Sequence, residues 1–511
     1  MQKSSWKRLL TKKIRHAGLC LGVLSLCALA TSADDTVSKS DKRRAQYPEL
    51  MNIYDLAEGT PAPLKALALL RIATAPGFKD VEWKEELLTE AFPAAAQEPS
   101  LWRTSYVFPS TGGLSVMPQR MQTSDDGNGG LLRLTLEAEI VEAMLGVDRN
   151  RANSMFQQIA PLRLPVLTCS DGLIPEVGAY YHAAAAVATN GFTADQKKNG
   201  DSAEFLRAVI AAISSPVEIK AAANMLVAQH LSPGDAAAVT GDFARRLEML
   251  SGDDRAFFAD LGGTSKAVMS LADSLNDSLA TAVLKAWRNH LILNLTGDRC
   301  KESVNPKWHY AKVATDAVAA FNSRVVGRES VAPIEKDDIH PGNTAAGSAD
   351  ESPVQLSAAE SELHRRWFAI EFAKQGEGLS NEQKADPEWI ANFDKYLDDI
   401  VDLKPSDGES DADVLQRKCG MMHMAIMVAP PGPLTDRVIA QYVQLLQVNN
   451  ISLELVSSWY SEVASFLSSA DTLNQARGTA LKAMEASNNP PLILVAKLEK
   501  LKDAAANTAR K

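Results

Sequence analysis

The feature that most constrains this chain is a long succession of amphipathic stretches with helical spacing. From residue 64 to residue 506, apolar side chains recur every three or four positions, as in residues 203–214, where Leu206, Val209 and Ile210 share one face. Almost no window alternates between apolar and polar residues with the period of two that strands require. The sequence therefore predicts an all-α protein with little or no sheet.

The expected helices cover residues 64–75, 82–96, 131–146, 149–159, 173–190, 203–214, 216–230, 234–250, 278–295, 307–325, 357–375, 387–402, 412–428, 434–448, 452–469, 472–487 and 491–506. Four prolines follow a residue that can cap a helix, which fits helix starts. These pairs are Ser215-Pro216, Ser232-Pro233, Asp386-Pro387 and Asn489-Pro490. Short loops between such helices favour stacked antiparallel helical hairpins, an α-solenoid-like architecture. The same Asn-Asn pair ends an amphipathic stretch twice, at Asn449-Asn450 and at Asn488-Asn489, 39 residues apart. This spacing is close to that of helical-hairpin repeats.

The first thirty residues have the pattern of a secretory signal peptide. A lysine- and arginine-rich start is followed by an apolar run, Ala17 to Ala30, that is too short to span a membrane comfortably. We expect cleavage near Ala30 and export to the periplasm or beyond. Cys20 and Cys27 each follow a leucine, whereas lipoprotein processing prefers a small residue there, so a lipid anchor is the less favoured alternative.

The rest of the chain divides by composition into four parts. Residues 31–62 are expected to be a partly disordered extension and 63–326 an N-terminal helical array. Residues 327–356 are rich in Gly, Pro, Ser and mixed charge, which predicts a flexible linker. A smaller C-terminal array then covers 357–506. No later run is apolar enough for a membrane span, and a net charge of −10 without basic clusters argues against nucleic acid as a partner.

The usual signatures of catalysis and cofactor binding are missing from the sequence. It contains no Gly-Lys dipeptide, hence no Walker A loop, and no His-Glu dipeptide, hence no HExxH zinc helix. It also contains neither a GxSxG elbow nor a GxGxxG turn. We therefore expect no cofactor, no metal and no catalytic residue.

A cluster near Cys169 is the first of four local features that carry reactive side chains. Tyr180, Tyr181 and His182 follow this cysteine closely, and they predict a speculative groove with a nucleophile or a soft metal. Tyrosines that simply pack one face of a helix explain the same pattern and are the favoured interpretation.

The second feature is an acidic turn with Asp407, Glu409, Asp411 and Asp413 at alternate positions. This alternation resembles the first ligands of a calcium loop, but the glycine and the final glutamate of an EF-hand are misplaced. The turn is better read as solvated, with Asp411 or Asp413 capping the next helix.

In the third feature, His309 follows Trp308 and marks either a pH-responsive site or an aromatic helix start.

The fourth feature is a group of methionines around one histidine. Met421, Met422, Met424 and Met427 surround His423 in the sequence, as in copper-binding segments. This spacing spreads the side chains around a helix, so that core filling is the favoured interpretation.

Three cysteines follow the signal segment. Buried thiols that behave as small apolar groups are the favoured interpretation for all three, Cys419 included. Export also permits a disulfide bond, and the pair that the sequence suggests for this alternative is Cys169 with Cys300.

Several strings in the chain, among them LPVLTCSDGLIPEVGAYY, GDRC, ADPEW, KPSDGESDAD, KCG and APPGPLTDRV, resemble an uncharacterised family of exported bacterial helical proteins. The resemblance covers residues 64 to 502. It implies that Cys169, Cys300 and Cys419 lie in recurring motifs, and it supplies no activity and no catalytic residues.

Taken together, these patterns predict an exported helical scaffold that binds protein or peptide partners through a groove. The alternative is a periplasmic hydrolase or cell-wall-active enzyme whose site lies in a helical groove near Tyr180, Tyr181 and His182. A purely structural role comes third.

Overall fold

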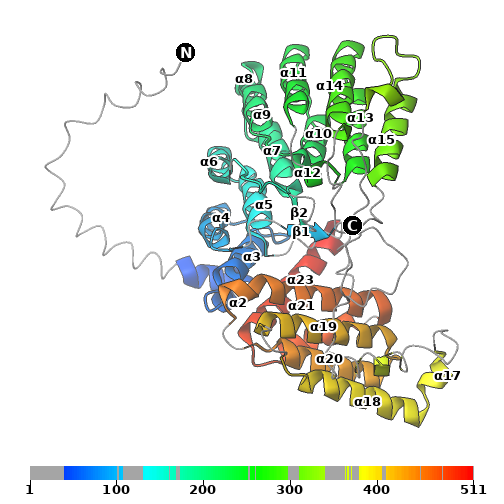
Figure 1. Cartoon of the computed structure of the whole chain (residues 1–511). Coiled ribbons are helices and arrows are strands. Elements are labelled where there is room, and N and C mark those ends of the chain that lie inside the picture. Colours follow the sequence, from blue (N-terminus) through cyan, green and yellow to red (C-terminus); the bar gives the residue numbers. More distant parts are fainter. Residues whose placement is uncertain are drawn as a thin grey trace, which may run out of the picture. The chain divides into compact units, whose positions relative to one another are not determined.

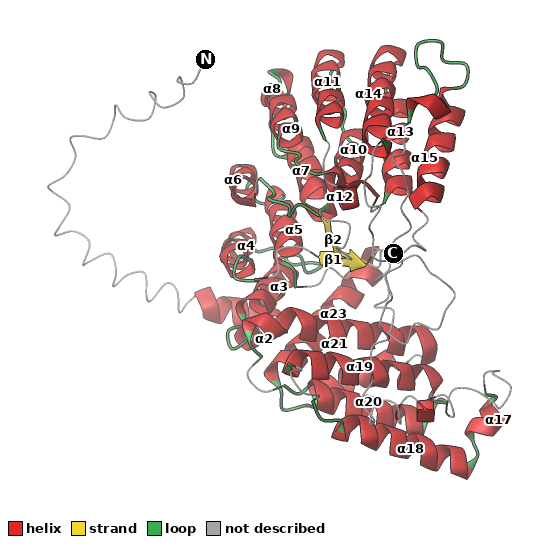
Figure 2. Cartoon of the chain, viewed as in Figure 1, coloured by secondary structure: helices red, strands yellow, loops and turns green. Residues whose placement is uncertain are grey.

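The computed structural model describes residues 39–99, 103–106, 131–159, 161–167, 173–250, 254–258, 260–296, 310–339, 363, 365–367, 370, 379–405, 410–448, 451–474 and 476–509. It confirms an all-α fold, in which the described residues form helices joined by loops (Figures 1 and 2). The chain divides into two compact units, Met1–Asp55 and Leu56–Lys511.

The first unit contains a helical stretch, residues 39–46, and most of α2 (Pro48–Ala57). The Arg44 guanidinium donates to both carboxylate oxygens of Asp55, at 2.8 and 3.3 Å. The expected signal peptide lies outside the described residues, and cleavage near Ala30 stays a prediction.

The second unit holds all the remaining elements. They are α3 (Ala62–Ala73), α4 (Val81–Ala95), β1 (Arg103–Tyr106), α5 (Arg133–Leu145), α6 (Arg149–Ile159), β2 (Leu173–Glu176), α7 (Gly178–Asn190), α8 (Ala194–Lys198), α9 (Asp201–Ala211), η1 (Pro216–Glu218), α10 (Ile219–Val227), α11 (Pro233–Met249), α12 (Asp254–Phe258), α13 (Leu261–Ser274), α14 (Asp277–Leu295), α15 (Tyr310–Val325), η2 (Lys336–Asp338), α17 (Asn381–Lys384), α18 (Pro387–Asp402), α19 (Asp411–Val428), α20 (Pro433–Leu446), α21 (Leu453–Asn474), α22 (Arg477–Glu485) and α23 (Pro490–Ala509).

Neighbouring helices in this unit pack against one another in an ordered succession. α3 contacts α4 and α5, α5 contacts α6 and α7, and α10 contacts α13. α9, α11 and α14 lie side by side (Figure 1). Among the later helices, α19 packs on α20 and α21, and both α21 and α23 contact α3. Large aromatic side chains such as those of Trp287, Trp459 and Phe321 are completely buried in these contacts, which is the main source of stability for amphipathic helices.

All four helix starts predicted from a capping residue before proline are confirmed. The Ser215 hydroxyl accepts from the backbone N–H of Val217, and that of Ser232 accepts from Asp235. The Asp386 carboxylate accepts from Glu388 at 2.8 Å, and the Asn489 amide oxygen accepts from Leu492 at 3.2 Å. Each side chain satisfies a backbone donor that the first helical turn leaves unpaired.

Three helix predictions need correction. Residues 173–190 do not form one helix, because 173–176 form β2, which pairs antiparallel with β1 and places Pro175 opposite Thr104. Proline disfavours helical geometry at the residue before it, which suits an extended start. The sequence did not predict α13 as a helix. The helix expected over residues 452–469 is longer in the structure, where α21 continues to Asn474.

The predicted linker begins with a packed segment, residues 328–339, which we call the strap. Val331 and Ile334 of the strap are buried at 2% and 3% exposure. The Asn322 amide of α15 donates to the Ile334 carbonyl at 2.9 Å and accepts from its N–H at 2.7 Å. The flexible-linker prediction is thus wrong for these residues, because their backbone groups are bound by helix side chains. Residues 340–356 lie outside the described part of the chain.

Across the described residues, no helix is both long and apolar enough to cross a membrane.

Candidate functional site

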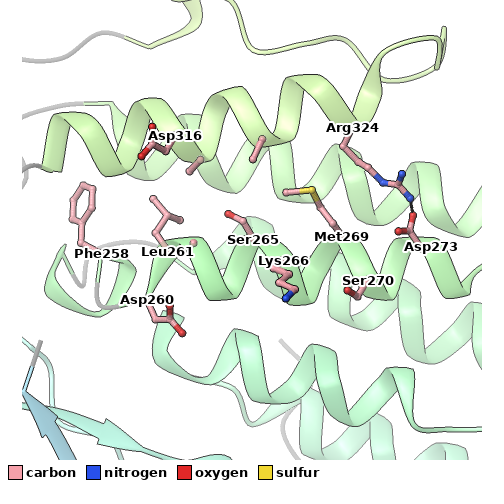
Figure 3. A pocket seen from close by; sticks show the side chains of 13 residues that line it. Phe258, Asp260, Leu261, Ser265, Lys266, Met269, Ser270, Asp273, Asp316 and Arg324 are labelled. Carbon is pink, nitrogen blue, oxygen red and sulfur yellow. Dashed lines mark ion pairs between the residues drawn. The ribbon is translucent and has the colours of Figure 1, made fainter. Parts of the chain in front are cut away.

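A cavity of about 790 Å³ lies between α13 and α15 (Figure 3). We call it the α13–α15 groove. Its lining residues come from the end of α12, from the α12–α13 junction and from facing sides of the two long helices. They are Phe258, Asp260, Leu261, Gly262, Ser265, Lys266, Met269, Ser270, Asp273, Asp316, Ala317, Ala320 and Arg324. Cavities of this size accommodate small ligands or short peptide segments.

Helical spacing explains why one side of α13 lines the groove along its whole length. Leu261, Ser265 and Met269 are four residues apart and therefore lie on one face, one above the other. Opposite them, α15 presents Ala317 and Ala320. Because these alanines and Ser265 are small, the two helices pack without filling the space between them. The groove therefore has a largely apolar floor.

Ser265 is the polar group of this floor. The residue is 2% exposed, and its hydroxyl oxygen has no hydrogen-bond partner in the described structure. Figure 3 shows the side chain on the side of α13 that faces α15. A buried hydroxyl without a partner costs about 1–3 kcal/mol, so a ligand that bonds to it would recover this cost.

Charged side chains lie at both ends of the groove. At one end, the Arg324 guanidinium forms an ion pair with the Asp273 carboxylate (Figure 3). At the other end, Phe258 and Asp316 lie near the start of α15, and Asp260 lies at the start of α13. Asp260 also caps α13 by accepting from the Gly263 N–H at 3.1 Å.

One external contact adjoins the Phe258 end of the groove. Asp260 accepts from the Lys220 ammonium of α10 at 2.7 Å. Both side chains are about half exposed, so this ion pair is weak.

The predicted groove residues of α7 do not face a common cavity. Tyr180 and Tyr181 are 2% and 1% exposed, whereas the His182 side chain is 75% exposed. His182 lies 2.7 Å from the Glu142 carboxylate of α5. The two tyrosines fill the core, as the packing interpretation predicted, and the histidine forms a surface link between α5 and α7.

Tyr181 and Glu218 form a buried polar pair that holds η1 in place. The Tyr181 hydroxyl donates to Glu218 at 2.7 Å, and the same carboxylate accepts from the backbone N–H groups of Ser214 and Ser215. Burial, and secondarily the Glu218 carboxylate, raises the pKa of Tyr181 well above its ordinary value. With its oxygens occupied in this way, Glu218 performs a structural role.

The cysteine predictions are tested only in part. Cys169 and Cys300 both lie outside the described residues, so that their disulfide bond stays a prediction. Cys419 is a free thiol with 0% exposure. Burial raises the pKa of Cys419, with a smaller contribution from Glu462, which keeps the sulfur in the unreactive thiol form.

The methionines of α19 do not converge around His423. Met422 is completely buried, whereas Met427 is 47% exposed. The His423 ring lies 3.0 Å from the Ser469 hydroxyl of α21, and burial lowers its pKa. No group of three or more histidine, cysteine or acidic side chains suited to a metal ion occurs in the part of the chain that the structure describes.

The acidic turn contributes a helix cap. The Ser410 hydroxyl accepts from the Asp413 N–H, and the Asp413 carboxylate accepts from the Ser410 N–H, both at 3.3 Å. The N-cap of α19 is thus Ser410, with Asp413 as its reciprocal partner, rather than Asp411 or Asp413. Asp407 and Glu409 lie outside the described residues, as do Trp308 and His309.

A second concentration of ionisable side chains lies where α21 and α23 meet the first helices. Burial raises the pKa of Glu139, which lies 3.6 Å from the Arg71 guanidinium. It also raises the pKa of Tyr460. In α23, Glu499 accepts from Arg477 of α22 at 2.9 Å. These groups are paired across packed helices, so we assign them to helix docking.

Comparison with known proteins gives no further guide. No family model, no curated protein and no solved structure matches the chain. The α13–α15 groove is therefore interpreted from its own geometry. The sequence did not indicate it, since α13 was not predicted as a helix.

Proposed function

We propose that this protein is an exported helical scaffold that binds a peptide segment of a partner protein in the α13–α15 groove. The observation that carries the proposal is the buried Ser265 hydroxyl, which lines an apolar groove and has no partner within the described structure. Peptide backbones offer both donors and acceptors, and either would satisfy a serine hydroxyl.

Polar links between neighbouring helices support a stacked, solenoid-like arrangement of hairpins. Lys220 and Asp260 are 40 residues apart in the sequence, as are His182 and Glu142. The Asn289 amide donates to Glu248, 41 residues away. Separations near 40 residues, as in these three pairs, are expected when one hairpin packs on the next. Stacked hairpins present extended grooves for binding.

The strap supports the proposal with an example within the chain. The Arg288 guanidinium of α14 donates to the carbonyl oxygens of Ala332 and Pro333 at 3.0 Å, and Asn322 binds both backbone groups of Ile334. Helix side chains thus hold a non-helical segment through its backbone. The same helix, α15, forms one wall of the groove.

A pair of substitutions on α15 tests the proposal. Ala320 and the neighbouring Ala319 are both exposed, but only Ala320 is among the groove-lining residues. Ala320→Trp places a large ring in the cavity, and Ala319→Trp places the same ring on the surface. Proteins captured by in-cell crosslinking should be lost with Ala320→Trp and retained with Ala319→Trp, at equal thermal stability. Equal capture by both variants would contradict binding in the groove.

A further inference from the structure

The position of α15 sets the width of the α13–α15 groove, because this helix forms one of the two walls. α15 packs mainly against α13 and less extensively against α14. One polar link to α13 is the ion pair of Arg324 with Asp273 (Figure 3). These side chains are 40% and 45% exposed, so that the pair stabilises the contact only weakly. A second set of polar links holds α15 from its other side, through the strap.

The strap bridges α14 and α15 with polar anchors on both helices. From α14, the Arg288 guanidinium donates to two strap carbonyl oxygens at 3.0 Å and forms an ion pair with the Asp338 carboxylate. From α15, the Asn322 side chain binds both backbone groups of Ile334. Hydrogen bonds that involve a charged group are stronger than those between neutral groups, so Arg288 is the main anchor.

The strap and the groove lie on opposite sides of α15. Ala320 and Arg324 are four residues apart, so that they share the side that lines the groove. Asn322 follows two residues after Ala320, which turns its side chain by about 200° around the helix axis. Neither Asn322 nor Arg288 is among the residues that line the groove. Both therefore act on the groove through the position of α15.

The packing between the strap and α15 is incomplete. A cavity of about 340 Å³ lies between the strap and the end of α15, and Val325, Val331 and Pro333 are among its lining residues. Side chains beside a cavity lack contacts on one side, so the strap depends strongly on its polar anchors. Loss of one anchor should release the strap and let α15 move relative to α13.

We propose that the strap is a clamp that holds α15 in the position that forms the α13–α15 groove. Arg288 and Asn322 are positioning residues, which control the groove without contacting a ligand. The effect of the clamp on partner capture rests on the proposed function, whereas its effect on α15 does not.

Amide hydrogen exchange in the full chain, measured by mass spectrometry, tests the clamp without a ligand. Arg288→Ala and Asn322→Ala should each speed exchange about tenfold in the strap and in α15, and leave α4 unchanged. Alanine is a better helix former than asparagine, so that faster exchange in α15 of Asn322→Ala reflects the lost anchor. Arg207→Ala, which breaks an ion pair with Asp242 of α11, is the control and should change neither the strap nor α15.

The outcomes separate the clamp from the proposed function. Faster exchange in the strap alone, or in neither segment, would overturn the clamp. In-cell crosslinking then tests the groove, where Arg288→Ala should lower the amount of captured partner about fivefold. Unchanged capture despite faster exchange in α15 would overturn control of the groove by the strap. If the native chain captures no partner while both exchange results are as expected, the proposed function fails and the clamp stands.

Discussion

At the scale of single residues, the informative side chains are buried polar groups. Glu218 has four hydrogen-bond donors around it: the Tyr181 hydroxyl, the Ser214 hydroxyl and the N–H groups of Ser214 and Ser215. Ser265 and Glu137 each keep a buried oxygen without a partner in the described structure. Satisfied groups stabilise a fold, whereas unsatisfied ones cost free energy. An unsatisfied buried group therefore indicates either a ligand-binding site or a position that destabilises the fold. Substitution of the residue distinguishes these two possibilities.

Ser265→Ala should stabilise the unliganded protein and weaken ligand binding. The substitution removes an unpartnered buried hydroxyl and puts a better helix former in α13. We expect the free energy of unfolding to rise by about 1 kcal/mol, measured by urea denaturation, while peptide affinity falls. Ser154→Ala, at an exposed position of α6 away from the groove, is the control. A loss of stability in Ser265→Ala would show that the hydroxyl has a partner.

Glu137 should make stability depend on pH. Burial raises its pKa above the ordinary 4.5, although Arg133 opposes this. The unfolded carboxyl then ionises at lower pH than the folded one, so the free energy of unfolding falls as pH rises above 4.5 towards the folded pKa. Glu137→Gln should be more stable than the native chain at pH 7 by about 1 kcal/mol, with the difference shrinking towards pH 4. A difference that grows on acidification would contradict this sign.

At the scale of elements, local chemistry explains what could be predicted. Capping residues before proline marked four helix starts correctly, because the cap and the proline act within one turn. α13 was missed, because Gly262, Gly263 and Thr264 begin it with poor helix formers. Its packing against α10, α14 and α15 compensates for that weakness, and tertiary contacts cannot be read from local spacing. The groove was missed with it, since α13 supplies one of its two walls.

The strap should open when its main anchor is removed. Arg288 holds it through two carbonyl oxygens and through the Asp338 carboxylate. Trypsin cleaves after arginine and lysine, and the strap contains Arg328 and Lys336. Arg288→Ala should therefore raise the rate of cleavage at these two sites by about tenfold, and mass spectrometry of the digest measures this rate. Arg207→Ala, which breaks an ion pair between α9 and Asp242 of α11, should leave that rate unchanged. Rapid cleavage of the native strap would mean that these contacts do not hold it.

At the scale of the whole molecule, the all-α fold was predictable because nearly every amphipathic stretch has the period of a helix. The arrangement of helices was less predictable, since contacts such as the Lys220–Asp260 ion pair join residues 40 positions apart, and local spacing does not indicate such contacts. Export, the disulfide bond of Cys169 with Cys300 and the two-array division stay predictions. The central claim is that partners bind in the α13–α15 groove.

The most direct test places a photo-crosslinking amino acid at position 270, on the exposed rim of the groove, and separately at position 204 on α9. After illumination of cells, the position 270 variant should form one recurrent crosslinked product with a partner protein, and mass spectrometry should locate the link in one short segment of that partner. Position 204 should give none. The same product from both positions, or products from neither, would contradict binding in the groove.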